Sequence, residues 1–215
     1  MEKGGNRREQ MKKKDQFVLV GNGKVFRDEK DMMLLDREQA DNAFKKYKKE
    51  VLDVIMAEHG FLKWKTKAYV RLNPIGLLEY MDLQKERYGS KTFCVNFAVM
   101  PLYAPLDYID MGLGNRLGHY ISGKDFWWDY ADDETAKASF VNVAEAVKLY
   151  LLPWLEHFSD EENYRQRLLQ DQSKSFIGYP NQAWLEALDS QEKEAVMEEN
   201  ISRLKLPGKI LTKIK

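Results

Sequence analysis

The chain has 215 residues, with 34 Lys and Arg against 34 Asp and Glu, so its formal net charge is zero. Balanced charges and an aromatic content of 12% argue against a disordered chain. No apolar run reaches the ~18 residues of a membrane-spanning helix, and the one cysteine, Cys94, cannot form an internal disulfide. The composition therefore predicts a soluble globular protein, without membrane contact, in the reducing environment of the cytoplasm.

Residues 1–35 are expected to form an N-terminal arm. Residues 1–16 are polar and charged and predict a flexible segment, and a small hairpin with its turn at Gly21-Asn22-Gly23 is expected to follow. A helix is expected over about 37–58, with Asp36 as its N-cap. Its apolar residues recur at spacings of three and four, and they are Phe44, Tyr47, Val51, Val54 and Ile55.

From residue 61 the apolar period changes to two, which predicts a half-buried strand, or a bent strand pair, over 61–72. Two further strands are expected at about 77–86 and 91–100, joined by short turns as an antiparallel meander. The segment around 113–121, which contains Arg116-Leu117-Gly118-His119-Tyr120-Ile121, predicts a fourth strand.

The rest of the chain has helical patterns. A helix over about 134–152 is expected, with Asp132 or Asp133 as its cap, and Pro153 either ends it or starts the next segment. Ser159 and Glu162 form a capping-box pattern before a helix at 160–171. Shorter helices follow at 182–189 and 191–204, and the basic tail after Pro207 is expected to be loose.

This order of elements predicts an α+β fold, with an antiparallel sheet of three to five strands. The N-terminal helix and the C-terminal helices are expected to pack mainly on one face of that sheet. The predicted organisation is an arm at 1–35, a core domain at 36–172 and a helical extension with a loose tail at 173–215.

Several short motifs occur in a characteristic order along the chain. They are His59-Gly60-Phe61, Tyr69-Val70-Arg71, Leu83-Gln84-Lys85, the alternating residues 93–97, Arg116-Leu117-Gly118, Trp127-Trp128 and Leu152-Pro153. Over about residues 40–158 the chain resembles the bacterial family called domain of unknown function 4304. The resemblance implies an α+β domain and brings no catalytic residue, cofactor or substrate; by analogy, such families include immunity and interaction proteins. One departure is Trp64-Lys65-Thr66-Lys67, which stands where the family has a Gly-Asn-like turn.

No catalytic residue, metal site or cofactor is assigned from the sequence. The three histidines, His59, His119 and His157, lack the spacing of metal ligands. His119 would need a neighbouring carboxylate or nucleophile to act as a general base. Cys94 lies in an apolar strand pattern, where a buried structural cysteine is the expected interpretation.

The residues Trp127, Trp128 and Asp129 form a candidate binding surface. One tryptophan is expected in the core and the other at the surface, among acidic residues between 125 and 134. Because tryptophan is enriched at interface hot spots, this pattern suits a protein partner that carries basic residues. The alternative is that both tryptophans pack on the end of the sheet.

Polar residues on the middle strands suggest a candidate pocket, formed by Gln84 and Asn96 with Arg116 and His119 beside them. The alternative is a solvated outer face of the sheet. The alternation also gives strand 61–72 a basic outer face, made of Lys63, Lys65, Lys67, Tyr69 and Arg71. That face either contacts nucleic acid, with Tyr69 stacking on a base, or keeps the sheet soluble.

The hypothesis that the sequence favours is a cytoplasmic, non-enzymatic protein, either a monomer or a small homo-oligomer, that binds another protein. The alternative is a small-ligand-binding domain or an enzyme that uses the polar face of the sheet. Nucleic acid is disfavoured as a partner because the net charge is zero.

Overall fold

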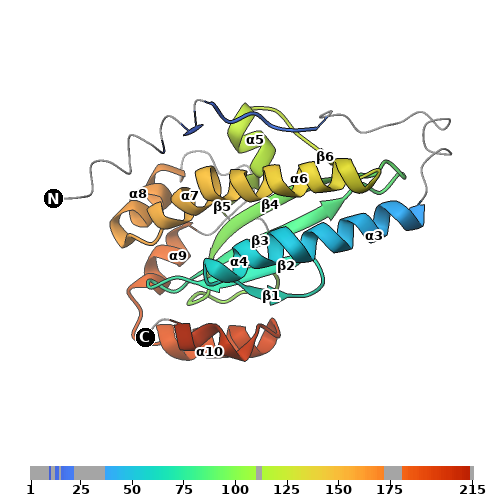
Figure 1. Cartoon of the computed structure of the whole chain (residues 1–215). Helices are drawn as coiled ribbons and strands as arrows, with labels where there is room; N and C mark the ends of the chain where they lie inside the picture. The colour runs from blue at the N-terminus through green and yellow to red at the C-terminus, as the bar shows by residue number, and fades with distance from the viewer. Residues whose placement is uncertain are drawn as a thin grey trace. The chain divides into compact units, whose positions relative to one another are not determined.

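The computed structural model describes residues 10, 13–14, 16–21, 37–109, 113–171 and 181–213 (Figure 1). Residues 17–20 are extended and Gly21 forms a bend. The rest of the predicted hairpin and the predicted cap Asp36 lie outside the described residues.

The strands form one six-stranded sheet, in the order β1-β2-β3-β4-β5, with β6 also paired to β4. Their bounds are β1 Leu62–Trp64, β2 Ala68–Leu72, β3 Leu77–Lys85, β4 Thr92–Pro101, β5 Leu113–Arg116 and β6 Trp128–Asp129. The pairs β1–β2, β2–β3 and β4–β6 are antiparallel. The α+β fold and the predicted meander are therefore confirmed, with one strand more than expected.

Helices precede β1 and follow β6, and one short helix lies between β5 and β6. Their bounds are α3 Arg37–Tyr47, η1 Lys48–Leu52, α4 Asp53–Glu58, α5 Leu117–Ser122, α6 Asp133–Ala146, η2 Val147–Leu151, α7 Leu152–His157, α8 Glu161–Asp171, α9 Asn181–Leu188, α10 Lys193–Arg203 and η3 Gly208–Lys213. Because α3, η1 and α4 follow one another without a break, they confirm the predicted helix at 37–58. Both η1 and η2 are single π-helical turns.

The chain divides into two compact units. Unit 1 comprises residues up to 55, 83–95 and 116–153, and unit 2 comprises 56–82, 96–115 and 154–215. Five elements, α4, β3, β4, β5 and α7, contribute residues to both units.

Unit 1 is built on two helices, α3 and α6, which lie side by side (Figure 1). Phe44 from α3, Phe93 from β4 and Phe140 from α6 form its aromatic core, with ring centroids 5.0–5.3 Å apart. The sequence places these rings on the buried stripes of their elements, and aromatic pairs in this range add to the stability gained from burial.

A capping box fixes the start of α6, and its N-cap is Asp132, one of the two predicted candidates. Asp132 is the N-cap, and its Oδ1 accepts from the Thr135 backbone N–H at 2.8 Å. The Thr135 hydroxyl oxygen accepts in return from the Asp132 backbone N–H at 3.1 Å. Two of the N–H groups that an isolated helix start leaves without partners are thereby satisfied.

Unit 2 has its own apolar cluster on one face of β1, β2 and β3. Buried members from the sheet and the adjoining segment are Trp64, Ala68, Val70, Leu72, Leu78, Met100 and Leu102. Met197 and Ile201 of α10 pack against this cluster, and so does Ile210 of η3, which is only 1% exposed. The tail after Pro207 is therefore ordered as far as residue 213, contrary to the predicted loose tail, because its apolar residues are anchored in this core.

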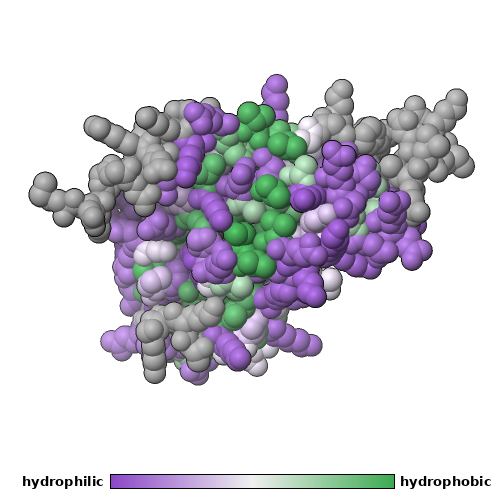
Figure 2. Space-filling view, viewed as in Figure 1, coloured by the Kyte–Doolittle hydropathy of each residue, from purple (hydrophilic) through white to green (hydrophobic). Residues whose placement is uncertain are grey.

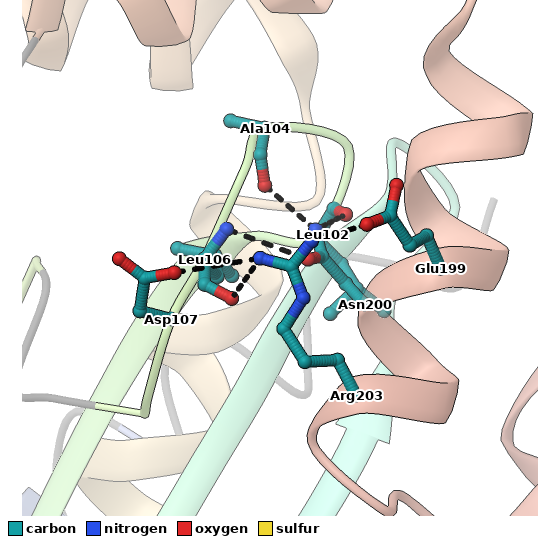
Figure 3. A network of polar contacts seen from close by, with 7 residues as sticks. All are labelled: Leu102, Ala104, Leu106, Asp107, Glu199, Asn200 and Arg203. Carbon is teal, nitrogen blue, oxygen red and sulfur yellow. Dashed lines mark hydrogen bonds and ion pairs between the residues drawn. The ribbon is translucent and has the colours of Figure 1, made fainter.

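A buried amide attaches α10 to the segment after β4 (Figure 3). The Asn200 side chain is 1% exposed, and its Nδ2 donates to the carbonyls of Leu102 at 2.8 Å and Ala104 at 2.7 Å. Its Oδ1 accepts from the Leu106 backbone N–H at 3.4 Å. One side chain thus satisfies three backbone groups of an irregular segment that has no strand partner for them.

An arginine closes the same network at its exposed edge. Arg203 donates to the Leu106 carbonyl and to Asp107, each at 3.4 Å, and also pairs with Glu199 one turn back (Figure 3). Exposed pairs of this kind contribute little by themselves, so the buried Asn200 is the main polar anchor of α10.

The structure changes three predicted boundaries. The helix beginning at Asp133 does not end at Pro153, which was one of two alternatives, but continues through the proline to His157. The π-turn η2 ends at Leu151, two residues before the proline. Proline lacks an N–H and its ring crowds the carbonyl four residues earlier, so a wider turn there allows the helix to continue. The cap of α8 is Asp160 rather than Ser159, since Asp160 Oδ1 accepts from the Asn163 N–H at 3.0 Å.

The third change concerns the predicted strand around 113–121, where residues 113–116 form β5 as expected but residues 117–122 form α5. Gly118 explains the difference. A Cβ at Gly118 would lie 2.5 Å from the Cβ of Phe126, so the helix can approach this neighbour only because residue 118 is glycine. That close approach depends on tertiary packing, which outweighs the strand propensity of Tyr120 and Ile121.

Candidate functional site

Of the two middle strands, β4 has no solvated face, whereas the polar side of β3 is partly exposed. All ten residues of β4 are buried, including Thr92, Cys94 and Asn96 on the polar side. Cys94 is fully buried, and its Sγ lies 3.7 Å from Gln84 Oε1. The interpretation of Cys94 as a buried structural residue is therefore supported.

Asp82 organises the polar side of β3 in unit 2. Its Oδ1 accepts from Asn96 Nδ2 at 2.8 Å, and its Oδ2 accepts from the Tyr80 hydroxyl at 2.7 Å. Burial and the bond to Asp82 raise the pKa of Tyr80. The tyrosine thus remains a neutral donor, and the three side chains satisfy one another instead of pointing free groups at a ligand.

The other two residues of the predicted pocket, Arg116 and His119, meet at Asp125 in unit 1. Arg116 Nη1 lies 2.5 Å from Asp125 Oδ2, and His119 Nδ1 lies 3.9 Å from Asp125 Oδ1. The Arg116 guanidinium also lies over the ring of Trp127, 5.4 Å from its centroid. We call these four residues, Arg116, His119, Asp125 and Trp127, the Arg116 cluster.

Local structure explains why the Arg116 cluster forms. Arg116 is the extended residue before α5, His119 lies on the first turn of that helix, and the chain reverses after Ser122 to bring Asp125 back. Gly123 closes α5 with a φ of +72°, and its N–H donates to the His119 carbonyl at 2.8 Å. The side chains of Arg116 and His119 therefore face one carboxylate beside a short helix.

The Arg116 cluster is a surface feature. The side chains of Arg116, His119 and Asp125 are 32%, 47% and 51% exposed. An exposed ion pair contributes only ~0–1 kcal/mol to stability and is screened by salt. The Ser122 hydroxyl donates to the Gly118 carbonyl at 2.8 Å, so it is not oriented as a nucleophile toward His119. The geometry fits a contact surface better than general-base catalysis.

The two tryptophans differ in burial. Trp128 is fully buried, and its Nε1 donates to Asn142 Oδ1 at 3.0 Å, whereas Trp127 is partly exposed. Asp129 Oδ1 accepts from the Ala131 backbone N–H at 3.0 Å. Burial raises the pKa of Asp129, while backbone N–H groups oppose that shift. Asp129 therefore shapes the turn that follows β6.

Most of the acidic residues expected around the tryptophans have partners within the chain. Asp125 pairs with Arg116, Asp132 caps α6, and Asp133 accepts from the Tyr47 hydroxyl at 2.5 Å and from Lys46 Nζ at 3.0 Å. The predicted acidic rim is thus largely neutralised internally, which removes the reason to expect a strongly basic partner.

The basic strand face does not have the geometry expected for stacking on a base. Tyr69 is 1% exposed. Arg71 forms an ion pair with Glu79, opposite it on β3, and donates to the His59 carbonyl at 2.8 Å. A buried tyrosine cannot stack on a base and a paired arginine offers little to a phosphate, so this alternative loses its two central residues.

An open depression of about 600 Å³ lies between α3 and the start of α6. It is lined by Glu38, Gln39, Asn42, Ala43, Lys46 and Asp133. Lys46 and Asp133 pair with each other there, which leaves the depression without an uncompensated charge from these two residues. Across the part of the chain that is described, no group of three or more His, Cys, Asp or Glu residues could hold a metal ion.

Two residues of these sites were not anticipated from the sequence. Asp125 joins Arg116 to His119, but this depends on a chain reversal that the sequence pattern did not reveal. Asn142 is 3% exposed within the apolar stripe of α6. A lone amide at a buried helix position was a signal that could have been recognised, because such groups require partners.

Comparison with known proteins gives the class of domain. Residues 52–157 match the model of the family described as Domain of unknown function (DUF4304). This match confirms the resemblance over these residues, from the end of η1 to the end of α7. No match was found among curated proteins or among solved structures. In the described ranges, no helix is long and apolar enough to span a bilayer.

Proposed function

We propose that the protein is a non-enzymatic, cytoplasmic binding protein whose partner is another protein, contacted through the Arg116 cluster. The observation that carries the proposal is the partly exposed Trp127 ring with the Arg116 guanidinium over it. Tryptophan and arginine are the residue types most enriched at interface hot spots. The half-exposed ion pair beside them resembles the polar rim of an interface.

Neighbouring residues support the same surface. Tyr120, on the same short helix, is 43% exposed, and Phe126, next to Trp127, is partly exposed. The pairing of Arg116 with Asp125 orients the guanidinium before any partner arrives, which lowers the conformational entropy lost on binding. The single thiol, Cys94, supports a reducing compartment.

The test is recovery of a partner by the full-length tagged chain expressed in its own host. We expect a stoichiometric protein to co-purify with the wild type, and recovery to fall at least tenfold for Trp127→Ala, since truncating a hot spot typically costs ~2 kcal/mol or more. Tyr88→Ala is the matched control, because Tyr88 is 79% exposed on the β3–β4 turn and should be neutral. Equal recovery with Trp127→Ala, or no specific protein at all, would contradict the proposal.

A further inference from the structure

An extended N-terminal segment lies on α6 of unit 1. We call residues 17–21 the N-terminal strap; Figure 1 shows it in blue beside α6. Its residues alternate in exposure: Phe17 and Leu19 are half-buried, whereas Val18 and Val20 are 71% and 45% exposed. Figure 2 shows apolar side chains at the surface on this side of the molecule.

One side-chain amide binds the backbone of the strap. Asn142 Nδ2 donates to the Val18 carbonyl at 2.8 Å, and Asn142 Oδ1 accepts from the Val20 N–H at 2.9 Å. These are the two groups that a neighbouring β-strand would bind, because the carbonyl of one residue and the N–H two residues later point to the same side of an extended chain. The contact therefore involves only backbone groups of the strap, and it does not depend on which side chains stand at positions 18 and 20.

The Asn142 amide is held in position by a buried residue of the core. Asn142 Oδ1 also accepts from Trp128 Nε1 at 3.0 Å, and Trp128 is fully buried. This bond fixes which end of the amide accepts and which end donates. The Asn142 amide is therefore oriented by Trp128 and does not depend on the strap for its orientation.

The side chains at each end of the strap fit particular neighbours. The Phe17 ring packs on Tyr150 of the π-turn η2, with centroids 5.4 Å apart, and the Tyr150 hydroxyl donates to the Lys14 carbonyl at 3.2 Å. At the other end Gly21 has a φ of +152°, and a Cβ there would lie 3.1 Å from the Phe126 ring. A side chain at this position is disfavoured by both backbone conformation and space.

From these contacts we propose that the face of α6 around Asn142 is a binding groove for an extended apolar peptide, which the chain's own N-terminal strap occupies in cis. The occupant is a segment of a partner protein with an aromatic residue, an aliphatic residue two positions later and a glycine two positions after that. The peptide class follows from the groove itself. Only the assignment to a partner protein rests on the proposed protein-binding function.

The geometry also connects the groove with the Arg116 cluster. Gly21 approaches Phe126 and the carbonyl of Trp127, so the strap ends beside that cluster. A partner peptide that replaces the strap would therefore bring the rest of the partner to Trp127 and Arg116. The strap is then an autoinhibitory segment that keeps the groove filled until a partner competes for it.

The test uses the full chain with a single change in the strap. Val20→Pro removes the N–H that donates to Asn142 and keeps an extended backbone, so it should release the strap without disturbing the core. Val18→Pro is the control, because it keeps the carbonyl that accepts from Asn142 and replaces an exposed side chain. The probe is a fluorescent peptide with the sequence of residues 14–21, followed by anisotropy.

We expect the peptide to bind Val20→Pro at least tenfold more tightly than it binds the wild type or Val18→Pro. Replacing the peptide glycine with valine, or its phenylalanine with serine, should abolish binding. Failure of the peptide to bind Val20→Pro would overturn the groove, whatever the co-purification experiment shows. If the wild type is a dimer and Val20→Pro is a monomer, the groove binds the strap of a second copy. That result would overturn the proposal that its occupant is a partner peptide.

Discussion

At the scale of single residues, two lysines hold backbone conformations that usually belong to glycine. Among the described residues, Lys65 and Lys205 have φ values of +57° and +53°. Both adjoin Trp64, because Lys65 Nζ lies over its ring, 3.9 Å from the centroid, and the Lys205 carbonyl accepts from its Nε1 at 3.1 Å. Lys65 lies in the turn between β1 and β2, so this turn contains a strained residue.

Relief of that strain is measurable. A non-glycine residue in the left-handed region costs about 1 kcal/mol, which the exposed cation–π contact of Lys65 only partly offsets. We expect Lys65→Gly to be about 1 kcal/mol more stable than Lys67→Gly, since Lys67, in the same turn, has no positive φ. Urea unfolding of both variants decides this, and equal destabilisation would contradict it.

A second prediction concerns the buried carboxyl of Glu79. Glu79 is fully buried, and in the described structure its Oε1 has no hydrogen-bond partner, while Oε2 pairs with Arg71. Burial raises the pKa of Glu79 above its ordinary value of 4.5, and Arg71 opposes the shift. Because the folded chain holds this proton more tightly than the unfolded chain, this group favours folding below pH 4.5 and its contribution is lost as pH rises.

Arg71→Met should make that pH dependence steeper. Without the arginine the pKa of Glu79 rises further, and leaving a buried charge unpaired costs ~3–5 kcal/mol at neutral pH. We expect Arg71→Met to lower the free energy of unfolding, relative to the wild type, by less at pH 4 than at pH 7.5. The double variant Arg71→Met, Glu79→Gln should lose this difference. A deficit that does not change with pH would show that Glu79 is not responsible.

At the scale of elements, the capping box of α6 has a clear energetic prediction. Asp132→Ala removes the acceptor of the Thr135 N–H and should lower the free energy of unfolding by about 1 kcal/mol. Asp132→Asn keeps an equivalent acceptor and should remain within about 0.5 kcal/mol of the wild type. Thermal or urea unfolding separates the two, and similar losses in both variants would point to charge instead of the cap.

The same scale shows what could be predicted from the sequence. Long helices and the strands of the meander have clear periods of 3.6 and 2, and these elements were found as expected. The helix α5 was missed because it depends on Gly118 fitting against Phe126, a tertiary contact. The strand β6 has only two residues, Trp128 and Asp129, which is too short for a period.

The candidate site was less predictable than the fold, for a related reason. Arg116 and His119 were singled out, but their link through Asp125 needs the reversal after α5. Gln84 and Asn96 were grouped with them on polarity, yet Asn96 donates to Asp82 and Gln84 accepts from Cys94. Polarity along a strand does not reveal whether a group is already satisfied by its neighbour on the next strand.

At the scale of the whole molecule, the two compact units share five continuous elements, which predicts one cooperative unfolding transition. Fluorine-labelled tryptophan provides probes in both units, since Trp127 and Trp128 belong to unit 1 and Trp64, Trp154 and Trp184 to unit 2. We expect the native resonances of all five to disappear at one urea concentration. Two separate midpoints would show that the shared elements do not couple the units.

The fully buried Cys94 has a practical consequence for work in solution. It is the only thiol in the chain and lies on a strand that is buried along its whole length. A thiol reagent can therefore modify the native protein only when β4 opens, and the rate of modification reports how often that happens. The modification rate of Cys94 therefore measures the opening of β4. In the native protein, a cysteine introduced at the surface would react with the reagent before Cys94 does.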